Sequence, residues 1–363
     1  MDRDAQWAAD GDARAIRFTG NWREYLPIAA SNVLLTIVTL GVYRFWAAAR
    51  QRRYLWAHTQ VIDDQLEWTG TGKEMFIGFL IVMALLMPFL LFVQFAFPAL
   101  VARGKDAAAG GLFMLFYIAI IYLGGIARFR ALRYRLSRTW WRGIRGGSDE
   151  PGWNYGGEYL GRHALSISTM FIMFPWAATR LWNSRWREMS FGGLAFTSNL
   201  GTDGLKRRWV GVYLAPLGMM LVAAFLGFAS IIGMGRDSGG VGIGVFAILG
   251  FLFLLFYIGI PLMVMHWYAK FYRKGAEALR LGDLEFGFDA TTWQWLKLFL
   301  GNLALAIITL GLGISYWGYR SWSFMVRHTH LHGEVNVSTL SQSTTRAPGE
   351  AEGFADAFDI GAI

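Results

Sequence analysis

The segment MFIGFLIVMALLMPFLLFVQFAFPALVA, residues 75–102, contains no Asp, Glu, Lys or Arg, and it decides the class of this protein. A helix needs about 20 apolar residues to cross about 30 Å of hydrocarbon, and this segment exceeds that length. Three further runs without charge, at residues 107–127, 210–235 and 238–265, also meet the requirement. We therefore predict four long transmembrane helices arranged as two hairpins.

The composition of the whole chain supports a membrane protein. Hydrophobic residues make up 55% and charged residues 16% of the sequence, whereas charged residues are roughly 25% of soluble proteins. The chain contains no cysteine, which excludes disulfides, thiolate metal sites and cysteine nucleophiles. The net charge of +9 comes from arginines near the ends of the apolar runs, so we expect anionic lipid headgroups as partners rather than nucleic acid.

Three shorter uncharged segments, at residues 25–43, 164–179 and 298–319, leave two topologies open. By the positive-inside rule, the Arg-rich segments on both sides of 164–179 should lie in the cytoplasm. As a helix, 164–179 would be only about 24 Å long. This favours re-entrant segments and a cytoplasmic location for residues 64 and 201. The alternative is seven full spans, which would give two inverted halves as in some transporters.

The two ends of the chain resemble each other without gaps when they are aligned 270 residues apart. The pattern R-x3-[YF]-x4-T-x3-G, part of the repeated unit, also fits near Arg130 and Tyr134, and a weaker copy contains Trp176 and Arg180. We expect repeats at about 18–70, 128–145, 153–197 and 286–340. Identical pairs in the terminal copies include Asn32 and Asn302, Thr39 and Thr309, Gly41 and Gly311, Arg50 and Arg320, and His58 and His328.

Residues four apart lie on one face of a helix, so Trp46, Arg50, Tyr54 and His58 should form a stripe. A guanidinium between aromatic rings gains about 0.5–2 kcal/mol of cation–π energy. The stripe is interpreted as an interfacial anchor, and a ligand site is the alternative. Gly41 and Gly311 should end helices, because glycine accepts the left-handed conformation.

Asn32 and Asn302 place amides in apolar helices, where an unpaired polar group is costly. A structural hydrogen bond across a helix interface is the first interpretation. A place in the lining of a transport pathway is the second.

Short alternating segments follow the stripes, such as Leu66 and Trp68, and indicate short cytoplasmic β-strands. The predicted fold is therefore an all-α integral membrane protein with four long helices, three shorter segments and short strands. A polar tail at 1–17 precedes a membrane domain at 18–340. An acidic tail at 341–363 should be disordered, because it has too little apolar surface to offset ordering entropy.

Candidate chemistry is sparse. His328, His330 and His332 alternate and could share a strand face, but no carboxylate triad accompanies them, so we expect a solvated strand and no metal. Motifs such as G-x4-G-K-[ST], G-x-S-x-G and H-E-x-x-H are absent from the sequence. We expect neither an enzyme nor a bound cofactor.

Several motifs resemble the YjgN-like family of bacterial inner-membrane proteins, whose function is not established. They are FTGNWREY at 18–25, NVLLTIVTLGVYRFW at 32–46, RTWWRGIR at 138–145 and YGGEY at 155–159. The resemblance implies a multi-pass protein of the inner membrane and supplies no catalytic residues. The third copy departs from the pattern: PWAATR at 175–180 survives, but its Asn and Thr-Leu-Gly do not, so any role of the asparagine must be altered there.

Two functions remain as hypotheses. The first is a transporter or permeation protein, favoured by duplicated helices that contain polar residues and breaks. The second is a non-transporting scaffold or envelope factor that binds lipid or a partner membrane protein. A continuous polar cavity touching Asn32 and Asn302 would support transport, and its absence would favour the scaffold. The sequence leaves the oligomeric state open.

Overall fold

The computed structural model describes residues 15–233, 250–333, 341–346 and 349. Most of the predicted N-terminal tail and most of the acidic C-terminal tail lie outside these residues.

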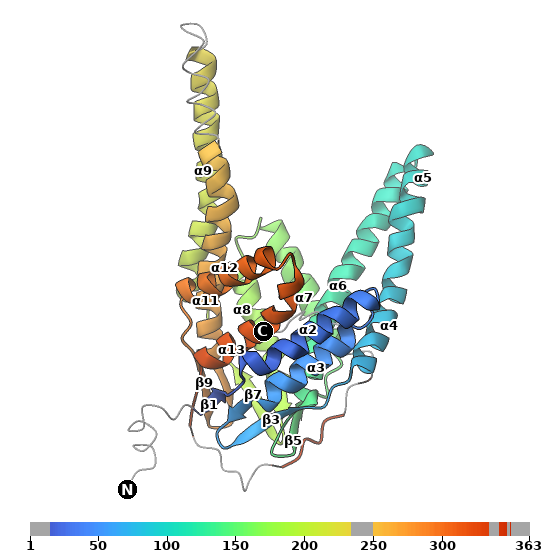
Figure 1. The fold of residues 1–363 in the computed structure, drawn as a ribbon. Coiled ribbons are helices and arrows are strands. Elements are labelled where there is room, and N and C mark those ends of the chain that lie inside the picture. The colour runs from blue at the N-terminus through green and yellow to red at the C-terminus, as the bar shows by residue number, and fades with distance from the viewer. Residues whose placement is uncertain (1–14, 234–249, 334–340, 347–348, 350–363) are drawn as a thin grey trace.

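The four predicted long helices are present and form two hairpins. In the first hairpin, α4 (Gly72–Leu91), the π-helical turn η1 (Phe92–Ala96) and α5 (Phe97–Ala102) are followed by α6 (Asp106–Arg138). In the second, α9 (Leu205–Gly233) is followed by η2 (Leu255–Gly259), another π-helical turn, and α11 (Ile260–Glu277). Among the described residues, four helices are long and apolar enough to cross a membrane: Gly72–Ala102, Asp106–Arg138, Leu205–Phe225 and Gly250–Glu277. The two hairpins diverge from a common base (Figure 1).

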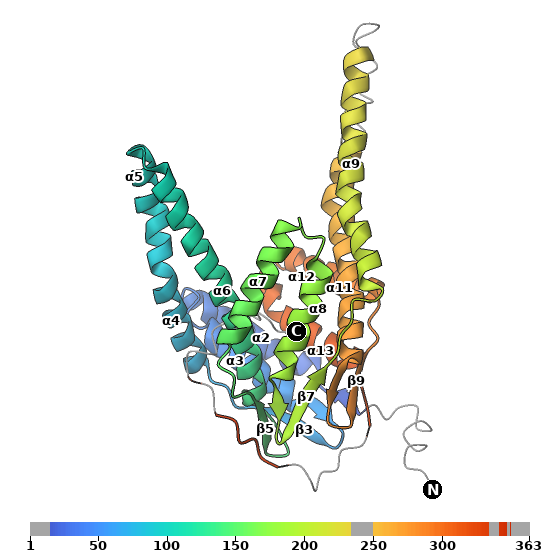
Figure 2. The ribbon, with the colours of Figure 1, turned by 180° about the vertical axis from the view of Figure 1, so that it is seen from behind.

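The three shorter apolar segments fold as short helical hairpins between the long ones (Figures 1 and 2). Each leaves the base, turns and returns to it, so none runs from one side of the molecule to the other. The hairpins are α2 (Trp22–Val38) with α3 (Arg44–Ala57), α7 (Trp153–Ser168) with α8 (Phe174–Arg187), and α12 (Thr292–Ile308) with the 3₁₀ turn η3 (Leu312–Tyr316) and α13 (Trp317–His328).

The predicted all-α class is wrong, because the base of the molecule is a ten-stranded antiparallel sheet. Every strand pairs with its neighbour in chain order, and β1 lies beside β10, so the sheet nearly closes into a barrel. The strands are β1 (Ile16–Phe18), β2 (Thr59–Val61), β3 (Asp64–Trp68), β4 (Thr139–Trp141), β5 (Ile144–Gly147), β6 (Ser190–Phe191), β7 (Leu194–Ser198), β8 (Leu279–Leu281), β9 (Leu284–Phe288) and β10 (Thr329–His332). Each strand is at most five residues long, so the alternating sequence indicates strands but not their assembly into one sheet.

Two-residue turns connect the strands on the side away from the helices. They are Ile62-Asp63, Arg142-Gly143, Gly192-Gly193 and Gly282-Asp283, and the first residue of each has φ between 51° and 59°. Positive φ values are typical of the turns that match the twist of tight β-hairpins. The described part of the chain therefore forms five units of strand, helical hairpin and strand, in which short and long hairpins alternate.

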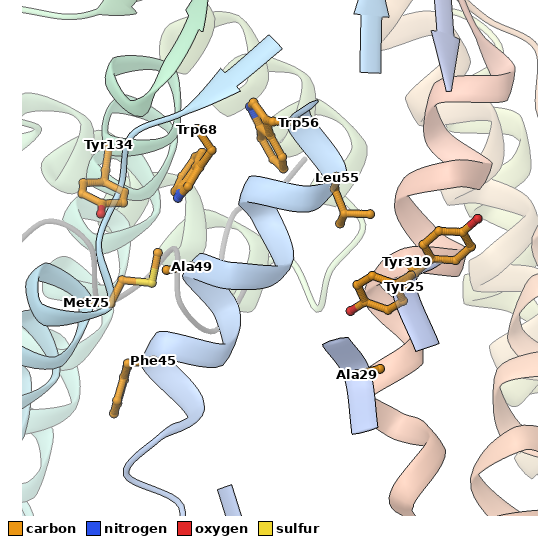
Figure 3. Close-up of a cluster of buried hydrophobic side chains, with 10 residues drawn as sticks. All are labelled: Tyr25, Ala29, Phe45, Ala49, Leu55, Trp56, Trp68, Met75, Tyr134 and Tyr319. Carbon is orange, nitrogen blue, oxygen red and sulfur yellow. The ribbon is translucent and has the colours of Figure 1, made fainter. Parts of the chain in front are cut away.

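One cluster of buried hydrophobic side chains lies where helices of the first, second and fifth units meet the sheet (Figure 3). Tyr25 and Tyr134 are fully buried there, and the ring of Tyr25 stacks on Tyr319 with centroids 5.0 Å apart. The Trp56 and Trp322 rings stack at 4.1 Å. These contacts join the first and fifth units, which are far apart in the sequence, and they hold the ring of hairpins together.

Part of the predicted C-terminal tail packs against the sheet. The Gln342 amide donates to the Gly143 carbonyl at 2.7 Å and its Oε1 accepts from the Arg145 N–H at 3.2 Å. The backbone N–H of Arg346 donates to Asp149 at 3.0 Å. Residues 341–346 therefore lie along β5 and the loop that follows it.

Candidate functional site

The tip of each short hairpin is built around a threonine. The hydroxyls of Thr39, Thr169 and Thr309 donate to the carbonyls four residues earlier at 2.6–2.7 Å. They accept backbone N–H groups four residues later, at 2.9, 3.4 and 2.7 Å respectively. After Thr39 and Thr309, Gly41 and Gly311 both adopt φ of 91°, as expected for a glycine that ends a helix.

The third copy makes the same turn with a different sequence. Met170 and Phe171 have φ of 49° and 66°, where the other copies have Leu and Gly. A left-handed conformation costs a non-glycine residue roughly 1–2 kcal/mol. The hairpin tip is thus retained in this copy at some cost in strain. The sequence signal that was missed is Thr169, which stands 130 residues after Thr39.

The predicted stripes connect helices within their own hairpins. Arg50 donates to the hydroxyl of Ser31 on α2 at 2.9 Å, and the rings of Tyr54 and His58 stack at 4.0 Å. His58 Nδ1 lies 2.8 Å from the Tyr54 carbonyl.

The corresponding residues of the fifth unit repeat this arrangement. The rings of Phe324 and His328 pack at a tilt with centroids 4.4 Å apart, and His328 Nδ1 lies 2.8 Å from the Phe324 carbonyl. Arg320 lies against Gly301 of α12. Trp46 is the exception among the stripe residues, because it packs beside Gly72 at the start of α4, in the next unit.

At the base of the first long hairpin, Glu74 joins α4 to α6. The Tyr134 hydroxyl donates to Glu74 Oε2 at 2.8 Å, and Arg138 Nη2 donates to Oε1 at 2.9 Å. Arg130, which belongs with Tyr134 to the repeated R-x3-[YF] pattern, donates from Nε to the Pro151 carbonyl at 2.9 Å. Its guanidinium lies 5.2 Å from the Trp153 ring. These pattern residues therefore fix α6 to its neighbours.

The two membrane asparagines lie inside their hairpins. Asn32 is 4% exposed and its Nδ2 donates to the Ala47 carbonyl of α3 at 3.4 Å. The Oδ1 atoms of Asn32 and Asn302 are buried without a hydrogen-bond partner among the described residues. In the third unit the equivalent position is Arg162, whose guanidinium lies 4.1 Å from the Trp176 ring.

The three histidines do not gather at one point, although the rings of His330 and His332 stack with centroids 6.5 Å apart. His328 contacts its own helix, as described above, whereas His330 Nε2 lies 2.9 Å from Asp289 on the neighbouring segment. Within the described ranges, no group of three or more His, Asp or Glu side chains could hold a metal ion.

A polar cavity of about 300 Å³ lies between α8 of the third unit and the loop that follows β7, which belongs to the fourth unit. Trp176 and Arg180, which the sequence singled out, line it together with Asn183 and Arg187. Asn199 and Thr202 of the loop complete its polar surface. Sequence reasoning missed the last four residues because the cavity forms only when the loop folds back onto α8.

Arginine side chains are also buried near the sheet. Arg52 lies 5.1 Å from the Trp68 ring, and Arg133 donates to the Glu150 carbonyl at 3.2 Å. Burial lowers the pKa of Arg185, although arginine keeps its proton in proteins. The interior above the sheet is therefore basic.

Long apolar helices mounted on a barrel-like sheet define an integral membrane protein of mixed α and β structure. The chain belongs to the DUF898 family, described as bacterial proteins of unknown function, which matches residues 13–357. It is 29% identical to inner membrane protein YjgN of Escherichia coli strain K12 over 136 residues, which are 38% of this chain and 31% of the relative. The YjgN of Salmonella typhimurium is 31% identical over 91 residues, 25% of this chain and 23% of the relative.

The aligned region thus spans about a third or less of the length of these curated relatives. No solved structure matches. The predicted family and the predicted location in the bacterial inner membrane are confirmed.

Proposed function

We propose that this protein is a non-transporting scaffold of the inner membrane, which crosses the membrane with its two long hairpins and inserts three short hairpins into one leaflet. The observation that carries the proposal is that the long hairpins diverge instead of packing into a bundle (Figures 1 and 2). In the 18-residue apolar stretch of each long helix, at most 17% of the residues are buried inside the protein. A transport pathway needs helices that enclose a polar surface, whereas these helices offer their apolar surface to lipid.

The position of the asparagines supports the same proposal. The Asn32 Nδ2 group donates to the other helix of its own hairpin, which supports a structural role for this side chain. The polar cavity beside α8 is lined by neither Asn32 nor Asn302. The feature that would favour transport is therefore not found at this cavity.

The tips of the short hairpins support insertion into the membrane. Leu40, Leu310 and Met170 are 94%, 93% and 72% exposed at the three turns, where exposure to water would be unfavourable. Both ends of each hairpin lie at the sheet, so the tip reaches into the bilayer and returns. Since the basic segments lie at this end of the long helices, the sheet belongs in the cytoplasm. Three wedges in the cytoplasmic leaflet could displace lipid there and recruit anionic headgroups or a partner protein.

The test uses the absence of cysteine from the chain. Single cysteines placed at 112–118 on α6 and at 217–222 on α9 are spin-labelled in lipid nanodiscs, and the accessibility of each label to oxygen and to a water-soluble nickel chelate is measured. The scaffold predicts oxygen access and little nickel access at every position. Met75→Cys, at a fully buried position of α4, provides a control inaccessible to both reagents.

A stripe of nickel access that recurs every three to four residues would reveal a water-filled pathway and refute the scaffold. Such a stripe on both hairpins would support the transporter instead.

A further inference from the structure

The cavity beside α8 has features of an anion site. Arg180, Asn183 and Arg187 follow one another on α8 at spacings of three and four, which places them on one face of the helix. Loop residues Asn199 and Thr202 face them. None of the lining residues is acidic, and two guanidinium groups, two amides and two hydroxyls supply the polar groups. The volume of about 300 Å³ is at the lower end of ligand sites, about 300–1,000 Å³.

One of the two arginines is already held in place. Arg187 donates from Nε to the Ser198 carbonyl at 3.0 Å and from Nη2 to Asn199 Oδ1 at 2.6 Å. Among the described residues, its Nη1 has no acceptor. Because Asn199 Oδ1 accepts from Arg187, the Nδ2 group of the same amide remains a donor for a ligand.

Asn183 fixes the loop against the helix. Its Oδ1 accepts the Ser198 hydroxyl and the Leu200 N–H, both at 2.8 Å, and its Nδ2 donates to the Leu200 carbonyl at 3.0 Å. All these groups are buried, so the cavity wall is preorganised and a ligand would not have to order it. Asn183 is a positioning residue.

Arg180 is the second cation. It makes no hydrogen bond or ion pair within the described part of the chain, and its guanidinium lies 5.9 Å from the Trp176 ring. Its counterparts Arg50 and Arg320 lie against the first helix of their own hairpins instead. In the third unit Arg162 takes the other contact with this tryptophan, at 4.1 Å. Arg180 is left to face the cavity.

The position of the cavity indicates where its ligand comes from. The loop that lines it leads directly into α9, which begins with Leu205 and then Lys206, Arg207 and Arg208 before its apolar run. Basic residues at the cytoplasmic end of a membrane helix lie at the level of lipid headgroups.

We propose that the cavity between α8 and the 199–202 loop binds a phosphate group, held by Arg180, Arg187 and the Asn199 amide. Guanidinium groups match the planar pairs of oxygen atoms that phosphate presents. The location favours the phosphate of an anionic phospholipid, and free phosphate is the other source of the same group. The site is independent of the scaffold proposal, because a transporter could carry it equally.

The test compares phosphatidylglycerol, phosphatidylcholine and inorganic phosphate as probes for the purified full chain. Native mass spectrometry in detergent measures retained lipid, and calorimetry measures phosphate affinity. We expect the wild type to retain phosphatidylglycerol in preference to phosphatidylcholine. The changes Arg180→Gln and Arg187→Gln should each weaken binding about ten-fold, the loss expected for one charge-assisted hydrogen bond. Arg53→Gln, on an exposed position of α3, removes the same charge away from the cavity and should have no effect.

The comparison of inorganic phosphate with phosphatidylglycerol separates the sources of phosphate. If inorganic phosphate binds as tightly as phosphatidylglycerol and displaces it, the ligand is free phosphate. Because Arg187 also holds the loop, Thr202→Phe is a second variant that fills the cavity without changing charge, and it should abolish the same binding. Unchanged affinity for both probes in folded Arg180→Gln and Thr202→Phe proteins would overturn the proposal.

Discussion

Glu74 provides a quantitative test of how the first long hairpin is attached to the rest of the fold. The change Glu74→Gln removes the carboxylate that accepts from Tyr134 at 2.8 Å and from Arg138 at 2.9 Å. The side chains of Arg138 and Glu74 are only 22% and 18% exposed, so water screens this pair weakly. Two hydrogen bonds to a charged group contribute about 2 kcal/mol each, and the glutamine retains one neutral bond of about 1 kcal/mol. The free energy of unfolding should therefore fall by about 3 kcal/mol.

The matched control removes a carboxylate that also pairs with an arginine but is more exposed. Asp63 pairs with Arg142 at the turn between β2 and β3, where the Asp63 side chain is 49% exposed. Asp63→Asn should cost less than about 1 kcal/mol, as exposed ion pairs do. Unfolding in mixed micelles with increasing SDS, followed by circular dichroism, measures both variants. Equal losses in the two variants, or no loss in Glu74→Gln, would refute the reasoning.

Three further predictions concern the hairpin tips, the core and the topology. Phe171→Gly should stabilise the fold by about 1 kcal/mol by relieving left-handed strain, whereas Gly311→Ala should cost about the same; thermal unfolding that shifts both variants in the same direction would contradict this. Trp322→Phe removes a 2.8 Å hydrogen bond to Thr59 and should cost about 1 kcal/mol in the SDS titration, and no change would show that this contact does not hold the first and fifth units together. Reporter tags after Asp64 and Gly201 should both report the cytoplasm, and a tag after Gly201 on the outside would support seven spans.

The long helices could be predicted from the sequence because the absence of charge over a full membrane thickness has one physical explanation. The sheet could not be predicted, because β6 has only two residues and its partner β5 is separated from it in the sequence by a whole helical hairpin. Local alternation reports that a segment is extended but not which distant segment it pairs with. A repeating T-x3-G was the available signal: the threonine starts β4 and β10, and the glycine falls in the turn after β4 and directly after β10.

The candidate site residues were also predicted in part: repeated residues were identified, and residues that occur once were missed. Thr39, Gly41 and His58 were identified because they recur with their whole hairpin, and the structure places them in helix ends and stacked pairs. Asn183 and Arg187 were missed, because nothing repeats them elsewhere and their partners are on a loop brought back by β7. Repetition in the sequence identifies the residues that every short hairpin needs in order to fold. The proposed ligand site occurs only once, so no repeated residue indicates it.

The alternation of short and long hairpins has a geometric consequence, because the described chain contains an odd number of these units arranged in a ring. Two kinds of object cannot alternate all the way around a circle of five, so two of the same kind must become neighbours where β1 meets β10. The neighbours are the short hairpins α2–α3 and α12–α13, joined through Tyr25 and Tyr319. In the membrane arrangement that we propose, the bilayer around the molecule would be divided into two unequal sectors, one with this pair of short hairpins and the other with the single short hairpin α7–α8. A molecule that diffuses in the membrane would therefore meet a different set of hairpins on each side of the protein.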